Sequence, residues 1–171
     1  MITEYKINWA VPGNIGYFIS TNETGNSKGR YKYANFSNQV GDDTKNVESN
    51  INELKTLHGL NNIIFMNQTH SNTVLRASKE STHLDCDAIF TQDKTISCAV
   101  LTADCIPILV TESSGRMIGC IHAGWRGLQS KIIENFFSKF KSISKSNFRI
   151  LLGPCISAQN YEVSDEIFCQ F

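Results

Sequence analysis

Three side chains of a kind that binds transition metals stand at the ends of apolar, β-like runs. His70 follows one such run, Cys105 lies between two of them, and His122 ends another. One thiol and two imidazoles, with a fourth coordination position left open, are the ligand set of a catalytic zinc centre. By softness alone, the same donors also suit copper. The residue types therefore predict a metal site built from three separate elements of the chain.

The same residues permit two other interpretations. Cys105 and one of the histidines could form a thiol nucleophile and its base, as in cysteine hydrolases. Each histidine could also be a hydrogen-bonded polar residue at a strand end, which is the commoner role of a lone histidine. A second histidine suited to the same site favours the metal.

Two charged residues beside the predicted ligands are candidates for catalytic roles. Asp104 ends an apolar strand, where a carboxylate is costly to bury without a partner. It could orient a ligating imidazole, act as a general base, or only cap a turn before Pro107. Arg126 offers a planar fork suited to phosphate or carboxylate, or it is an exposed arginine in a tight turn. Gly124 and Gly127 would let the backbone approach a ligand closely.

A helix and then a series of short strands are predicted along the chain. An aspartate at 42 or 43 can cap the start of a helix, and Gly59 can end it. Apolar residues at helical spacing predict a second helix after Gly127, continuing to Phe140. The expected strands cover residues 62–66, 73–76, 87–90, 96–101, 106–111, 117–121 and 148–152.

This order of elements predicts an α+β sheet protein. Strands outnumber helices, and the helices lie between groups of strands. The first forty residues are rich in Asn, Gly, Ser and Thr, and we expect strand and loop there. No linker divides the sequence, so we expect a single domain over residues 1–171.

Composition excludes several classes of function. The chain has 16 basic and 16 acidic side chains, which argues against a nucleic-acid binder and against a polybasic membrane-surface protein. A small or polar substrate fits better. No signal peptide and no membrane-spanning run are visible. The 6 cysteines do not resemble a disulfide framework, and we expect a cytoplasmic protein with reduced thiols.

Ordered motifs from about residue 35 to 165 resemble one family, the YfiH-like family. It is also called the multicopper polyphenol oxidoreductase or laccase-domain family. The resemblance rests on these segments: Asn-Gln-Thr-His at 67–70, Asp-Cys-Asp-Ala-Ile-Phe-Thr at 85–91, Thr-Ala-Asp-Cys-Ile-Pro at 102–107, His-Ala-Gly-Trp-Arg-Gly at 122–127, and Gly-Pro-Cys-Ile-Ser at 153–157 with Tyr-Glu-Val at 161–163. Val-Gly-Asp-Asp at 40–43 also matches the family's segment before its first helix.

The resemblance implies an α/β/β/α layered sandwich and a zinc ion held by His70, Cys105 and His122. It also implies purine nucleoside chemistry: phosphorolysis of adenosine, inosine, guanosine and methylthioadenosine with phosphate, and deamination of adenosine. Asp104 would then carry a proton, and Arg126 would hold phosphate. The older family name implies copper-dependent oxidation of phenols instead. We rank that second, because 4 histidines are too few for a conventional set of copper centres.

The sequence departs from the family pattern in four places, one of which is Ser71, where the family usually has glycine after the first ligand histidine. The chain stops soon after the Tyr-Glu-Val segment, so we expect a shortened C-terminus. Asn22 and Ile51 stand where the family usually has arginine, which weakens the expected hold on phosphate. A third hypothesis is therefore a truncated, catalytically silent zinc-binding domain. The oligomeric state and the preferred nucleoside are left open by the sequence.

Overall fold

The computed structural model describes residues 1–171 and divides into two units, Met1–Ile63 and Ile64–Phe171. The expectation of one domain over the whole chain stays a prediction. In the first unit, helix α1 (Thr44–His58) begins where the Asp43 side chain accepts a hydrogen bond from the backbone N–H of Lys45, at 2.9 Å. It ends at Gly59, which takes a left-handed conformation with φ 63°. The predicted helix and both of its caps are confirmed.

Asn50, on the buried face of α1, organises the loops that precede the helix. It is fully buried, and its side-chain oxygen accepts a hydrogen bond from the backbone N–H of Asn26 at 2.7 Å. Its amide group donates to Ser27 Oγ at 3.0 Å and to the carbonyl of Asn35 at 2.8 Å. The strand expected in the first forty residues is reduced to an isolated bridge between Glu4 and Ser20, because much of this backbone bonds to side chains instead.

The second unit contains a five-stranded sheet in the order β2-β3-β6-β5-β7. Strands β2 and β3 are parallel, and the other neighbours are antiparallel. A separate two-stranded sheet pairs β4 with β1, the strand at which the chain passes from the first unit to the second. The predicted strands are confirmed as β1 (Asn62–Phe65), β2 (Val74–Arg76), β3 (Ala88–Thr91), β4 (Ile96–Ala99), β5 (Ile106–Glu112), β6 (Ile118–Ala123) and β7 (Phe148–Leu152).

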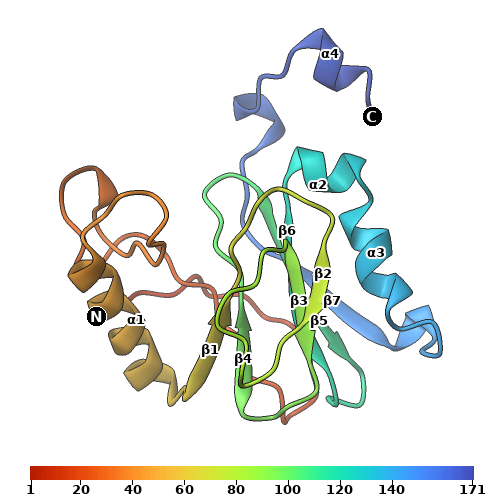
Figure 1. Ribbon diagram of the computed structural model, residues 1–171, viewed down its shortest axis with the longest axis horizontal. Helices are drawn as coiled ribbons and strands as arrows, with labels where there is room; N and C mark the ends of the chain where they lie inside the picture. Colours follow the sequence, from red (N-terminus) through yellow and green to blue (C-terminus); the bar gives the residue numbers. More distant parts are fainter. The chain divides into compact units, whose positions relative to one another are not determined.

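The two faces of the large sheet are buried against different partners. Because side chains alternate along a strand, neighbours on β6 face opposite ways. Ile121 packs in a cluster with Ile132 and Phe136 of helix α3 (Ile132–Ser138), whereas Cys120 packs in a second cluster with Ile96 of β4. Helices α2 (Trp125–Gln129) and α3 lie along one side of the sheet (Figure 1). The order of layers in this unit is helices, large sheet, small sheet.

The single helix predicted after Gly127 is wrong, since the structure has two. The first already begins at Trp125, and Lys131 interrupts the segment with φ 66° before α3. A left-handed residue cannot continue an α-helix. Phe140 lies beyond the end of α3 but still packs on Phe136, with ring centroids 5.4 Å apart.

The remaining elements are short. They are three 3-10 helices, η1 (Gly29–Tyr31), η2 (Lys145–Asn147) and η3 (Ala158–Asn160), and helix α4 (Asp165–Phe168). All six cysteines are free, as expected. None of the helices has the length and apolar character needed to cross a bilayer.

Replacing Asn50 by alanine should destabilise the chain by about 1–3 kcal/mol, because buried donors and acceptors lose their partner. Urea unfolding of the intact chain measures the effect. Asn52→Ala, at an exposed position on the same helix, should stay within about 0.5 kcal/mol of the parent. Equal effects of the two substitutions would contradict the role given to Asn50.

Candidate metal centre

Cys105 and His122 meet because the ends of two antiparallel strands coincide. In the β5–β6 ladder, Ile106 pairs with Ala123 and Pro107 pairs with His122. Cys105 directly precedes β5, so it lies beside the last residues of β6 at the same edge of the sheet. The register of one hairpin therefore brings the thiol and the buried imidazole together.

His70 comes from the loop between β1 and β2, and this loop is held by a buried carboxylate. Asp87 accepts hydrogen bonds from three successive backbone N–H groups, those of Thr69 at 3.2 Å, His70 at 3.0 Å and Ser71 at 2.6 Å. The φ of His70 is 59°, in the left-handed region. Successive N–H groups that converge in this way form a nest for an anion. The fully buried side chain of Asp87 occupies it.

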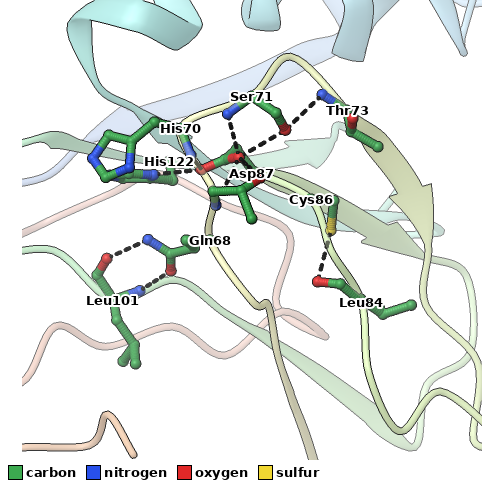
Figure 2. Close-up of polar contacts among 10 residues, drawn as sticks. Gln68, His70, Ser71, Thr73, Leu84, Cys86, Asp87, Leu101 and His122 are labelled. Carbon is green, nitrogen blue, oxygen red and sulfur yellow. Dashed lines mark hydrogen bonds and ion pairs between the residues drawn. The ribbon is translucent and has the colours of Figure 1, made fainter. Parts of the chain in front are cut away.

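The same carboxylate orients His122. Asp87 Oδ1 lies 2.7 Å from His122 Nδ1, and both side chains are buried (Figure 2). Burial raises the pKa of Asp87, but hydrogen bonds from His122 and Ser71 outweigh it and hold the pKa below the usual value. An ionised carboxylate only accepts hydrogen bonds, so His122 Nδ1 carries the proton and donates it. This leaves Nε2 as the lone-pair donor for a metal.

The three predicted ligands converge. One ligand atom from each of His70, Cys105 and His122 lies within 4.8 Å of the other two. The imidazole rings meet edge to face, with centroids 4.8 Å apart. Burial raises the pKa of the Cys105 thiol, and the charges of Asp104 and Asp87 raise it further. A bound cation would offset these effects, because metal binding stabilises the thiolate.

Gly124 leaves the space in which these ligands meet. A Cβ added at Gly124 would lie 2.9 Å from the Sγ of Cys105 and 3.2 Å from Cδ2 of His70. Its φ of −78° and ψ of 164° are ordinary extended values that any residue adopts. Glycine is therefore required at position 124 because a side chain would not fit, and not because of its backbone conformation. This agrees with the close approach to a ligand that the sequence suggested for Gly124. The donor set and the close approach that Gly124 permits together fit a metal ion.

Gln68 ties the loop of His70 to the segment that carries Cys105. Its side-chain amide donates to the carbonyl of Leu101 at 2.7 Å and accepts from the N–H of Leu101 at 2.9 Å. Figure 2 shows this paired contact beside the histidines. Two hydrogen bonds to the same residue restrict both translation and rotation, so the segments that carry the two candidate ligands are held in place relative to each other.

The two predicted catalytic residues lie outside this convergence. Asp104 is exposed, and its backbone carbonyl accepts a hydrogen bond from Ile156 at 3.0 Å. The orienting contact considered for Asp104 is made to His122 by Asp87 instead. Arg126 is exposed, and its guanidinium carbon lies 4.2 Å from the centroid of the Trp125 ring. A catalytic role for either residue stays a prediction.

Asp87 is the residue that sequence reasoning missed at this site. It lies between Cys86 and Ala88, both fully buried, and directly before β3. A carboxylate next to two small apolar residues at the start of a buried strand was the available signal, since an unpaired charge is not tolerated there. Its partner His122 is 35 positions away, so only the β3–β6 pairing reveals the contact.

The fold and the site together define a class of protein: an α+β protein with a His–Cys–His group at one end of its large sheet. The chain belongs to the family described as multi-copper polyphenol oxidoreductase laccase, whose model matches residues 16–171. It is 34% identical over 165 residues to a Haemophilus influenzae protein named purine nucleoside phosphorylase, covering 96% of this chain and 67% of that protein. It is 31% identical over 161 residues to Escherichia coli purine nucleoside phosphorylase YfiH, covering 93% and 66%.

A solved structure agrees with this assignment. The crystal structure of Neisseria meningitidis protein NMB0706 matches with a TM-score of 0.90 and 32% identity, covering 99% of this chain and 69% of that one. The predicted α+β, YfiH-like fold and the family resemblance are confirmed. The chain spans about two thirds of the length of these curated relatives.

Gly124→Ala should weaken zinc binding by about tenfold or more, because the new methyl group displaces Cys105 Sγ from the other ligands. The folded state should survive, since Sγ can rotate away. Competition with a chromophoric chelator measures the affinity, and circular dichroism checks the fold. Gly16→Ala, where nothing lies within 4 Å of the added carbon, is the matched control. Equal zinc affinity in both variants would refute this account of the site.

Asp87→Asn should lower zinc affinity by about 10–100-fold, the usual effect of removing a partner that orients a ligand. The amide cannot accept from His122 and from the nest as the carboxylate does. Asp85→Asn, two positions away and exposed, should bind zinc like the parent. Calorimetric titration distinguishes them. Parental affinity in folded Asp87→Asn would show that the carboxylate does not support the ligands.

Proposed function

We propose that this chain is a zinc-dependent purine nucleoside enzyme, acting by phosphorolysis of purine nucleosides and by deamination of adenosine. The convergence of His70, Cys105 and His122 at the sheet edge is the observation that carries the proposal. The relatives' names add support, since two of them are called purine nucleoside phosphorylase. Adenosine, inosine, guanosine and methylthioadenosine are the substrates proposed, with phosphate as the second reactant.

His70, Cys105 and His122 would hold the zinc ion, and Asp87 would keep His122 in the tautomer that binds it. When bound, zinc supplies positive charge that polarises a substrate atom or makes a water molecule more acidic. His70 is exposed while His122 is buried, so the open side of the site faces solvent next to His70. A nucleoside would approach from that side.

Asp104 is proposed as the group that moves a proton. It is exposed and adjacent in sequence to Cys105, so its carboxylate can face a substrate without a desolvation penalty. In deamination, water adds to the purine ring carbon and ammonia leaves, and Asp104 would carry the proton from the water to the leaving nitrogen.

Arg126 is proposed to hold phosphate. Stacking on Trp125 occupies one face of the guanidinium and leaves the N–H groups at its edge free for a bidentate contact. In phosphorolysis, a phosphate oxygen bonds to the sugar carbon, the bond from that carbon to the base breaks, and the base leaves with a proton. The arginine would align the attacking anion.

The chain's charge and thiols agree with small-molecule substrates in a reducing compartment. The 16 basic and 16 acidic side chains provide no excess charge for binding nucleic acid or an anionic membrane surface. Six free cysteines support the proposed cytoplasmic location. A copper-dependent phenol oxidase and a catalytically silent zinc domain are the competing outcomes of the test below.

Zinc-loaded protein incubated with adenosine in phosphate buffer should release adenine, and also inosine if deamination occurs. Chromatography identifies the products, and omission of phosphate should remove adenine, together with any hypoxanthine formed from inosine, but not inosine itself. His122→Ala should reduce the rate by about 100-fold or more, as loss of a metal ligand does. His83→Ala, at an exposed histidine away from the ligand group, should retain the parental rate.

No product from folded, zinc-bearing protein would overturn the proposal for this chain and favour the silent domain. Oxygen consumption with a phenol by the copper-loaded protein would favour the oxidase.

A further inference from the structure

The segment after β7 continues alongside the residues that carry Cys105. Strands β5 and β7 are antiparallel, with Ile108 paired to Leu152. Beyond that pair, the N–H of Gly153 donates to the carbonyl of Pro107 at 2.8 Å. The N–H of Ile156 donates to the carbonyl of Asp104 at 3.0 Å. The two contacts are three positions apart, whereas bonded pairs of an antiparallel ladder recur every two residues, so the regular ladder ends at Leu152 and the two segments continue side by side as loop.

This arrangement sets Cys155 opposite Cys105. We count on from the last pair of the ladder, Ile108 with Leu152, one residue back from Ile108 and one residue forward from Leu152 at each step. The third step pairs Cys105 with Cys155. Hydrogen bonds lie on both sides of the two cysteines. Antiparallel backbones joined by hydrogen bonds of this kind have facing Cα atoms about 4.5–5.5 Å apart. A disulfide needs a Cα separation of about 4.4–6.8 Å.

The environment of the two thiols separates them from the buried cysteines. Both are free, with Cys155 exposed and Cys105 half-buried. Burial raises the pKa of Cys98 to about 12 and that of Cys86 to about 11. Burial also raises the pKa of Cys105, so Cys155, the exposed thiol, is the one that meets the peroxide first. Cys155 follows the edge strand β7, so a small oxidant reaches it from solvent.

We propose that Cys105 and Cys155 form a reversible disulfide when the protein meets a peroxide, and that this bond removes Cys105 from the metal site. The Cys155 sulfur attacks a peroxide oxygen, the O–O bond breaks, and one water is released as a sulfenic acid forms. The Cys105 sulfur then attacks the Cys155 sulfur, and the sulfenic oxygen leaves as a second water. Two thiols are oxidised, hydrogen peroxide is reduced to water, and a thiol reductant reverses the bond.

The consequence for the metal rests on the proposed zinc function, whereas the bond itself does not. A disulfide sulfur carries no thiolate charge, so the oxidised chain keeps only His70 and His122 of the proposed ligands. Bound zinc would in turn occupy the Cys105 thiolate, so that this sulfur could not attack Cys155. Metal binding and oxidation therefore exclude each other at the same sulfur.

The test treats the metal-free, full-length chain with hydrogen peroxide and maps its tryptic peptides without reduction. The expected product joins residues 95–116, which contain Cys105, to residues 150–171, which contain Cys155. Each peptide has a second cysteine, so fragmentation by mass spectrometry assigns the bond. Cys155→Ser should abolish the product, and Cys169→Ser, at the other exposed cysteine, should retain it. Dithiothreitol should return the product to free thiols.

Zinc affinity of the oxidised chain, measured by chelator competition, should fall about tenfold or more and recover on reduction. Six free thiols after peroxide treatment, or a bond from Cys105 to another cysteine, would overturn the proposed disulfide and leave the zinc function standing. A Cys105–Cys155 bond with unchanged zinc affinity would instead refute Cys105 as a ligand, while the disulfide itself would be supported.

Discussion

The buried carboxylate of Asp87 is the interaction on which the geometry of this site depends. Removing a carboxylate from water is unfavourable unless hydrogen bonds and positive partners replace the solvent. Asp87 receives them from the backbone N–H groups of Thr69, His70 and Ser71, and from the ring of His122. One charge therefore holds together a loop and a strand that are far apart in the sequence. Neither the backbone of His70 nor the ring of His122 can move without leaving this charge less well satisfied.

The sequence predicted those elements whose signals are local. Helix α1 has a side-chain cap at Asp43 and a left-handed glycine at its end, and both act within a few residues. The strands of the large sheet were visible because short apolar runs bounded by turns are buried on both faces. The break between α2 and α3 was not visible. It depends on the left-handed conformation of Lys131. Lysine has no preference for that conformation, so the sequence does not predict the break.

The candidate ligands could be predicted from residue chemistry, but the group that arranges them could not. His70, Cys105 and His122 could be selected because they are thiol and imidazole groups at the ends of apolar runs. Asp87 is one of 16 acidic residues, and its partners become apparent only when β3 pairs with β6. Gly124 lies between these cases. Its position in a glycine-containing turn suggested close approach, and the structure identifies the approaching atoms as Cys105 Sγ and His70 Cδ2.

Strain at His70 shows how the buried charge and the exposed ligand are connected. A residue other than glycine in the left-handed region costs roughly 1–3 kcal/mol and persists only where its surroundings determine it. At His70 the nest around Asp87 does so, because the positive φ aims successive N–H groups at one carboxylate. The same turn carries His70, which is exposed, to the group of candidate ligands, where its ring meets the ring of the buried His122 edge to face. The anion is thus enclosed by protein, while the candidate ligand His70 on the same loop remains accessible to solvent.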